Sequence, residues 1–242
     1  MFSAISQDGI VARALANNLF NLDLINPRDF TTDNYRRIDD KTFGGGAGMV
    51  MKLEPLELSL ASARAKHESC GSNKSRVIYL SPQGKKIDQE TVNQLASSEG
   101  VIFVCGRYEG VDERFIERNV DMELSVGDFV VSGGELPAMI LIDAIVRQLP
   151  GAMNSQDSVT NDSFMDGLLD CPHYTVPRDY CGDKVPEVLF SGNHEQIRKW
   201  RLQQSLWRTY QRRPELLESK QLTKEQSRLL GDILSRNKIK GK

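Results

Sequence analysis

Two short, unbroken runs of apolar residues constrain the fold of this chain more than any other feature. Residues 77–80 read VIYL, residues 101–105 read VIFVC, and a shorter run, FVV, follows at 129–131. A strand with one face in water alternates apolar and polar side chains, whereas a strand buried on both faces does not. We therefore predict strands at these three places, in a parallel sheet that helices cover.

Helical patterns separate the apolar runs. We predict helices at residues 6–20, 88–96, 111–118 and 135–149. Asp88 can cap the second of these helices, and the last one carries Pro137 in its first turn and has Pro150 just past its end. Strands that alternate with helices define an α/β domain, which we place at residues 1–150.

The composition changes after this region. Residues 151–161 read GAMNSQDSVTN, a polar stretch of mostly small residues that is typical of a linker. Two capping-box patterns follow, Asn193 with Gln196 and Thr223 with Gln226, each ahead of a helical pattern. The predicted organisation is an α/β domain at 1–150, a flexible linker at 151–161 and a small all-α domain at 162–242.

The positive charge of the chain is local. The net charge is −2, yet residues 190–213 contain one acidic residue, Glu195, and six basic ones: Arg198, Lys199, Arg201, Arg208, Arg212 and Arg213. Trp200, Trp207 and Tyr210 interleave with them, and arginine with aromatic side chains is the combination that grips single-stranded RNA. A solvated basic face with some of the aromatic residues in the core is the alternative.

Several classes of protein are disfavoured. No apolar run approaches the ~20 residues of a membrane span, and the first residues do not resemble a signal peptide. The four cysteines are far apart, so we expect reduced thiols, a cytoplasmic location and no metal site; Cys171, His173 and Cys181 lack a fourth zinc ligand. The cluster at 44–48 (GGGAG) fits no nucleotide-binding motif.

Small residues follow the predicted strands. The segments are SPQG at 81–84, GRYEG at 106–110, SVGD at 125–128 and SGGE at 132–135. Ligands of parallel α/β sheets bind at the carboxyl ends of strands, where glycine lets the backbone approach a ligand. Ordinary strand-to-helix turns are the alternative for any single loop. From the residues alone we predict an α/β enzyme with a small-molecule pocket and a basic helical appendage.

At these loops the sequence closely resembles the bacterial tRNA (guanine-N1-)-methyltransferases. The resemblance covers about residues 1–235, and its motifs are YLSPQG at 79–84, CGRYEG at 105–110, SGGELP at 132–137 and GLLDCPHY at 167–174. Asp39-Asp40 with the glycine cluster, and LFSGNH at 189–194, belong to the same resemblance. Several long motifs in one order are far more specific than any single glycine pattern.

The resemblance implies a SPOUT fold, a parallel α/β sheet whose C-terminal part threads into a deep trefoil knot. It implies S-adenosyl-L-methionine as methyl donor and, as substrate, N1 of guanine 37 in tRNA, 3′ of the anticodon and preceded by another guanine. It also implies a homodimer with shared active sites, and it leaves a need for Mg²⁺ open. The implied cofactor-binding residues are Leu80, Ser81, Pro82, Gly106, Glu109, Val126, Gly127, Asp128, Phe129, Val130, Val131, Gly133 and Gly134.

Two residues carry the implied catalysis. Asp162 stands at the position of the general base for the N1 proton, and Arg147 at that of the group which stabilises negative charge on O6. Without the resemblance, Asp162 would be a helix N-cap and Arg147 an ordinary partner of Asp143 or of the helix dipole. Glu109 would meet the charged end of the cofactor or the guanine. Expected RNA or linker contacts are Asp39, Arg107, Tyr108 and His173.

The sequence departs from the family in two places. Members usually open with a short apolar strand, and this sequence begins after it, so we expect an incomplete or locally altered sheet. The stretch at residues 64–76 is longer by a few residues than in the family, which a surface loop tolerates. Two other functions are weighed against base methylation: a SPOUT ribose 2′-O-methyltransferase and an RNA-binding homologue without activity.

Overall fold

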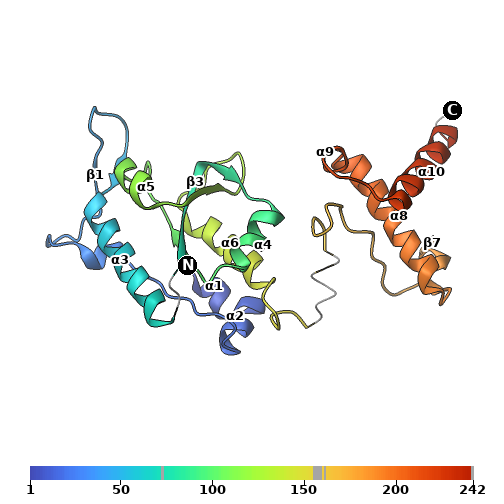
Figure 1. The fold of residues 1–242 in the computed structure, drawn as a ribbon, viewed down its shortest axis with the longest axis horizontal. Coiled ribbons are helices and arrows are strands. Elements are labelled where there is room, and N and C mark those ends of the chain that lie inside the picture. Colours follow the sequence, from blue (N-terminus) through green and yellow to red (C-terminus); the bar gives the residue numbers. More distant parts are fainter. Residues whose placement is uncertain (72–73, 155–159, 161, 241–242) are drawn as a thin grey trace. The chain divides into compact units, whose positions relative to one another are not determined.

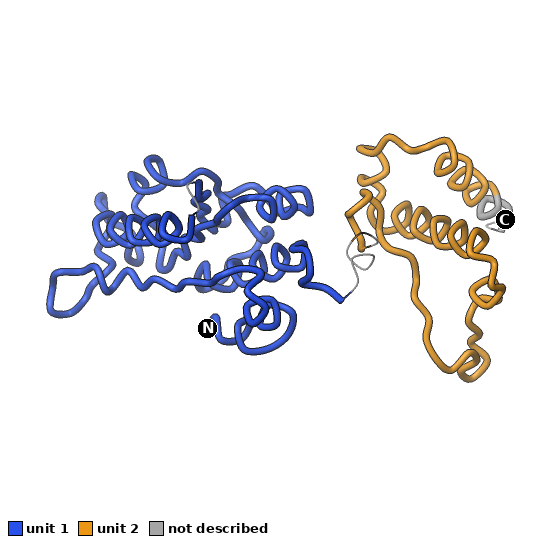
Figure 2. Tube along the Cα trace, turned by 60° about the horizontal axis from the view of Figure 1, so that its bottom comes forward, with its two compact units in different colours: residues 1–154 blue, residues 155–242 orange. Residues whose placement is uncertain are grey.

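The computed structural model describes residues 1–71, 74–154, 160 and 162–240 (Figure 1). The chain divides into two compact units, residues 1–154 and residues 155–242 (Figure 2). Most of the expected linker, residues 155–159 and 161, lies outside the described residues. No helix among those described is long and apolar enough to cross a membrane.

A three-stranded parallel sheet forms the centre of the first unit. Its strands are β3 (Ser75–Lys86), β4 (Gly100–Val104) and β5 (Met122–Ser125), in the order β4-β3-β5 (Figure 1). β3 pairs in parallel with both neighbours. The apolar runs at 77–80 and 101–105 are therefore strands of a parallel sheet, as predicted.

The prediction of a strand at 129–131 is wrong. Phe129 and Val130 are exposed and belong to a loop, and the third strand of the sheet is β5, with the sequence MELS. β5 lies at an edge of the sheet, and its sequence alternates apolar residues (Met122 and Leu124) with polar ones (Glu123 and Ser125). A search for unbroken apolar runs finds central strands and misses an edge strand of this kind.

Helices cover both faces of the sheet. On one face α3 (Leu53–Ser69) and α5 (Glu113–Asn119) pack against Val77 and Tyr79 of β3. On the other face α4 (Gln89–Ala96) and α6 (Glu135–Val146) pack against Ile78 and Leu80. Successive residues of β3 thus enter opposite cores, which explains why its apolar run is unbroken.

The predicted helices are present with shorter bounds. Asp88 caps α4, because its carboxylate accepts a hydrogen bond of 2.8 Å from the backbone N–H of Thr91. The helix expected at 6–20 is divided into α1 (Ser3–Ser6) and α2 (Gly9–Ala16), since Gly9 has a φ of +78° that no helix continues through. The expected loop at 64–76 is partly the last turns of α3. A 3₁₀ turn, η1 (Pro27–Phe30), contacts α3.

A small hairpin precedes α3. Its strands β1 (Asp39–Lys41) and β2 (Met49–Met51) are antiparallel, and the glycine cluster lies in the loop between them. The hairpin was not predicted, because β1 is three polar residues long and carries no apolar pattern.

Helices predominate in the second unit. They are α8 (His194–Arg212), α9 (Glu215–Glu218) and α10 (Lys224–Lys240), and a 3₁₀ turn, η2 (Glu187–Phe190), precedes them. A two-residue ladder, β6 (Asp179–Tyr180) with β7 (Asp183–Lys184), adds a β element to a region expected to be all helical. Leu168, Leu206 and Leu229 form the core of this unit.

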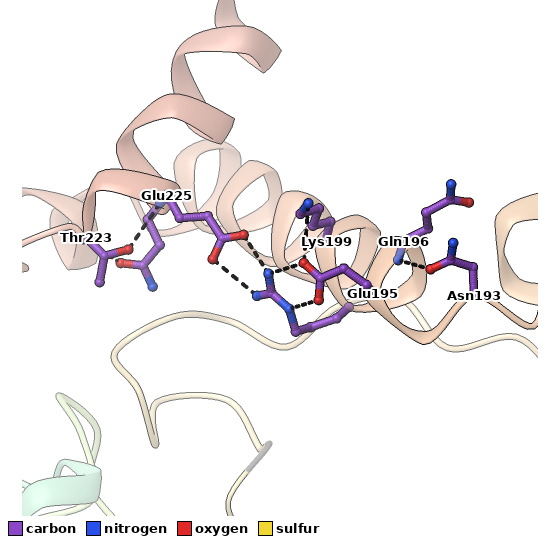
Figure 3. A network of polar contacts seen from close by, with 8 residues as sticks. Asn193, Glu195, Gln196, Lys199, Thr223 and Glu225 are labelled. Atoms are coloured by element: carbon purple, nitrogen blue, oxygen red, sulfur yellow. Dashed lines mark hydrogen bonds and ion pairs between the residues drawn. The ribbon is translucent and has the colours of Figure 1, made fainter.

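Both predicted helix caps of this unit are formed (Figure 3). The side-chain oxygen of Asn193 accepts from the N–H of Gln196 at 3.1 Å. Thr223 and Gln226 form a reciprocal pair, in which each backbone N–H donates to the other side chain. The start of each long helix is therefore fixed by local sequence.

Candidate active site

One wall of the candidate site is an interruption in β3. Leu80 pairs with Leu124 of β5, and five residues later Lys85 pairs with Leu124 again. Residues 81–84 therefore loop out of the ladder at its carboxyl end. A Cβ on Gly84 would lie 2.6 Å from the carbonyl oxygen of Glu123 and closer still to the next backbone atoms, so only glycine fits where the chain returns to the sheet.

Two further walls come from the loops after β4 and β5. The N–H of Gly134, just before α6, donates a 2.9 Å hydrogen bond to the carbonyl of Gly106, just after β4. A Cβ on Gly134 would lie 2.7 Å from the Cα of Cys105. The start of α6 thus packs backbone against backbone on the end of β4.

The three loops enclose a pocket of about 200 Å³ at the carboxyl ends of the strands. Eleven of the thirteen residues expected to bind the cofactor line it: Leu80, Ser81, Pro82, Gly106, Glu109, Val126, Phe129, Val130, Val131, Gly133 and Gly134. Gly127 and Asp128 do not line this pocket. Asp128 forms an ion pair with Lys86, and a Cβ on Gly127 would lie 2.8 Å from the Phe129 ring, so Gly127 makes room for that ring.

A larger groove of about 930 Å³ lies elsewhere in the first unit. It is lined by β4, by one side of α3 and by residues 19–28. Among the described residues β4 pairs only with β3, so this groove borders an open sheet edge. It is mostly apolar and reaches the strand-end loops only at Arg107, Tyr108 and Glu135, whereas the smaller pocket is built from these loops, and we therefore place the chemistry in the smaller pocket.

The ionisable groups around the pocket differ in whether they can act as a base at neutral pH. Burial, together with the nearby carboxylate of Glu135, raises the pKa of Cys105 to about 12. Burial and then Glu123 raise the pKa of the Tyr79 hydroxyl. Neither group is a base at neutral pH. Among the described residues that line the pocket, Glu109 provides the carboxylate.

The unpredicted hairpin is joined to the pocket loop by its backbone. The N–H of Glu109 donates to the carbonyl of Met49 at 2.9 Å, and the N–H of Met51 donates to the carbonyl of Gly110 at 3.0 Å. Met51 also forms a parallel bridge with Val111. The glycine cluster of the hairpin is therefore part of the architecture that surrounds Glu109.

The two expected catalytic residues lie in different units. Arg147 directly follows α6, and its N–H donates to the carbonyl of Asp143 at 3.1 Å. Asp162 begins a turn that the N–H of Met165 closes at 3.3 Å, and no helix starts there. The alternative role of Asp162 as a helix N-cap is therefore wrong.

Of the other expected contact residues, Arg107 and Tyr108 line the pocket, whereas Asp39 and His173 do not. Asp39 pairs with Met51 in the hairpin, and Arg107 forms a 2.8 Å ion pair with Glu135. The Tyr108 hydroxyl accepts a 3.2 Å hydrogen bond from Arg28. His173, in the second unit, is exposed.

His173 belongs to a small group of side chains with donor atoms. The ligand atoms of Asp170, Cys171 and His173 lie within 4.8 Å of one another, and Cys181 is not part of the group. Asp170 and His173 already share a 2.7 Å hydrogen bond. Burial and the neighbouring carboxylate raise the pKa of Cys171, which works against the thiolate that a zinc ion requires.

Half of the six basic residues at 198–213 have acidic partners. Arg198 contacts Glu195 at 2.9 Å and Glu225 at 2.6 Å, and Lys199 also contacts Glu195 (Figure 3). Hydrogen bonds from Arg198 and then Lys199 lower the pKa of Glu195 to about 2. A further pair joins Arg213 to Glu215. The remaining arginines, Arg201, Arg208 and Arg212, are spaced by seven and four residues and so share one face of the helix.

The aromatic residues of this helix pair with each other. Trp207 and Tyr210 stack with ring centroids 5.8 Å apart, and Trp200 lies 6.3 Å from Tyr174. The core of the unit consists of leucines, and both tryptophans are only half-buried beside it. These rings therefore remain partly open at the surface of α8, on a different side of the helix from Arg201, Arg208 and Arg212.

The fold and the pocket are those of an α/β protein with a cavity at the carboxyl ends of parallel strands. The chain matches the family model described as tRNA (Guanine-1)-methyltransferase TrmD over residues 1–219. It belongs to this family.

Curated relatives agree with the family match over nearly their whole length. A tRNA (guanine-N(1)-)-methyltransferase of Chromobacterium violaceum is 55% identical over 242 residues, which is 100% of this chain and 95% of the relative. Relatives with the same description are 58% identical in Pseudomonas fluorescens, over 98% of this chain and 94% of the relative, and 56% identical in Pseudomonas syringae pv. tomato, over 97% and 92%.

Proposed function

We propose that this chain transfers a methyl group from S-adenosyl-L-methionine to N1 of guanine 37 in tRNA. Membership of the family supports the activity, a tRNA (guanine-N1)-methyltransferase. The observation that carries the cofactor site is the pocket, because loops from three separate strand ends contribute to it the residues that the resemblance implied.

The pocket suits this cofactor in its chemistry. Glycines at 106 and 134 leave no room for a side chain, so a ligand there would meet backbone N–H and C=O groups. The apolar side chains of Leu80, Val126 and Phe129 offer surface to an adenine ring, and Glu109 offers a negative charge to a cationic ligand. When bound, S-adenosyl-L-methionine supplies an electrophilic methyl group.

The chain's own residues then have to manage a proton and a charge. We propose that Asp162 accepts the proton from guanine N1 as the methyl group arrives. A carboxylate is a weak base for this proton, so charge that develops on O6 must be stabilised as well. We assign that role to the guanidinium of Arg147.

The assembly that we propose is a homodimer with shared sites. α6 exposes Leu136 and Ile140 one turn apart, and the pocket loop exposes Phe129 and Val130, of which Val130 is 83% exposed. A second copy of the chain would cover these apolar side chains. The trefoil knot and the assignment of Asp162 to the opposite subunit's pocket belong to the same proposal and rest on the resemblance.

We propose that the second unit binds the tRNA through α8. Arg201, Arg208 and Arg212 can contact phosphates along one side of α8, and the partly open rings of Trp207 and Tyr210, on another side, can stack on bases. Because bacterial tRNA is cytoplasmic, we also propose that compartment for the enzyme.

The test is methyl transfer to tRNA transcripts that carry either guanine or adenine at position 37. Labelled S-adenosyl-L-methionine is the donor, and digestion to nucleosides identifies the methylated atom. We expect 1-methylguanosine from the first transcript and no product from the second. A 2′-O-methylated nucleoside would indicate the ribose enzyme, and tRNA binding without transfer would indicate an inactive homologue. A parallel reaction with EDTA decides whether Mg²⁺ is needed.

A further inference from the structure

The glycine cluster of the β1–β2 hairpin fits no phosphate-binding motif, and its four glycines have unequal surroundings. Side chains built on Gly44 and Gly45 would meet nothing within 4 Å, and one on Gly46 would meet only the Thr42 hydroxyl at 3.8 Å. A Cβ on Gly48, in contrast, would lie 2.5 Å from Cγ and 2.8 Å from Cδ of Glu109, with Oε1 closer still. One glycine of the cluster is thus in contact with the pocket carboxylate.

The side chain of Glu109 can lie against position 48 only because glycine has no Cβ there. In the described part of the chain no hydrogen bond or ion pair is formed by its carboxylate, although its backbone N–H is bonded to Met49 directly beside Gly48. Its backbone is therefore fixed by the hairpin, while its side chain lies in the space that the missing Cβ leaves. Any side chain at position 48 would push the carboxylate away from where it now lies.

We infer that Gly48 is a positioning residue, which sets the place of the Glu109 carboxylate in the pocket. The inference rests on the proposed function, since it assumes that this carboxylate serves methyl transfer. It gives the hairpin a role at the site: β2 fixes the backbone of Glu109, and the last glycine before β2 leaves the room that its side chain occupies.

The expected effect of Gly48→Ala on the transfer rate follows from how far the new Cβ would overlap with the Glu109 side chain. Ordinary contact begins at about 3.4 Å, so Cγ of Glu109 must retreat by about 1 Å to accommodate alanine at position 48. A displacement of this size in a catalytic site can cost ~10²-fold in rate. The overlap with Glu109 itself costs little stability, because Glu109 is exposed and its side chain can rotate into solvent. The positive φ of Gly48 adds a backbone strain, for which a control variant must account.

The test compares Gly48→Ala with Gly45→Ala. The two glycines have φ values of +81° and +79°, so alanine strains the backbone equally, but only position 48 contacts Glu109. We expect equal Tm values, and single-turnover methyl transfer about 10²-fold slower in Gly48→Ala than in Gly45→Ala. In a Glu109→Ala background, Gly48→Ala should cause no further loss, whereas a purely structural role would lower the rate again.

A crystal structure of Gly48→Ala adds a measurement that is independent of activity. We expect the Glu109 carboxylate to be displaced by about 1 Å or more, with the hairpin unchanged. Equal transfer rates for the two alanine variants, or an undisplaced carboxylate, would overturn the inference. A wild-type enzyme that transfers no methyl group would refute the proposed function, and the crystal structure would still decide the geometric part.

Discussion

The tightest backbone contact of the pocket gives a sharp prediction for Gly134→Ala. Gly134 has φ −71° and ψ −9°, a conformation that alanine adopts freely, so backbone strain plays no part. Alanine even raises the free energy of unfolding by ~0.4–1 kcal/mol, because it restricts the unfolded chain. The cost comes from the Cβ, which would lie 2.7 Å from the Cα of Cys105, about 0.7 Å inside ordinary contact.

Neither neighbour can yield without moving a secondary structure element. Cys105 follows β4, Gly134 precedes α6, and the N–H of Gly134 is bonded to Gly106. Overpacking of this kind costs roughly 1–3 kcal/mol. After the unfolded-state gain we expect a net loss of about 1–2 kcal/mol, which corresponds to a Tm lower by roughly 2–8 °C in a unit of this size.

Gly133→Ala is the matched control. Its Cβ would meet the ends of two flexible side chains, Glu135 and Arg107, which can move apart for the loss of one partly exposed ion pair. Urea titration measures the free energy of unfolding of both variants, and calorimetry measures their affinity for S-adenosyl-L-methionine. We expect Gly134→Ala to be the less stable variant and to bind the cofactor more weakly. Equal stabilities would refute the idea that backbone packing between β4 and α6 shapes the pocket.

Three other outcomes follow from the site. Asp162→Asn should retain cofactor affinity and lose most single-turnover methyl transfer, because an amide is a far weaker base; a near wild-type rate would place the base elsewhere. Gly133→Val should lose cofactor binding. After random subunit exchange between Gly133→Val and Asp162→Asn, half of the dimers are mixed and each of these has one intact site, so roughly a quarter of all sites should be active; inactive mixed dimers would rule out shared sites. A thiol reagent at pH 8 should modify the exposed Cys70 and Cys181 rapidly and Cys105 slowly, since the pKa of Cys105 is raised to about 12. Burial favours the neutral thiol of Cys105 over the thiolate. The contribution of Cys105 to the free energy of unfolding is therefore fully present below about pH 9 and falls as the pH rises toward 12.

The sequence predicted the elements that are determined locally or by burial on two faces. The apolar runs of β3 and β4 were found because both of their faces lie in a core. The caps at Asp88, Asn193 and Thr223 were found because each bonds within three residues. The pocket loops were found because glycine follows the strand ends.

What the sequence could not predict depends on partners that are distant along the chain. The interruption of β3 is visible only in its register with β5, where Leu124 pairs twice. Counting charges on α8 overestimated its positive face, because Arg198 is paired with Glu225, 27 residues away. The hairpin at the glycine cluster escaped notice because its strands are short and β1 is polar, and its importance lies in a contact with Glu109 about 60 residues later.

The glycines around the pocket serve different physical purposes, and substitutions should separate them. At Gly84 and Gly134 a Cβ would meet backbone, so alanine must move a strand or a helix and should cost stability. At Gly48 and Gly133 a Cβ would meet only side chains, which can rotate away, so alanine should leave the fold intact and move a charged group instead. Loss of activity beyond any loss of stability is therefore the expected signature of the second kind, and at Gly48 it is measured against Gly45→Ala, which carries the same backbone strain. An alanine scan that measures both quantities would distinguish the glycines that build the pocket from those that position its ionisable groups.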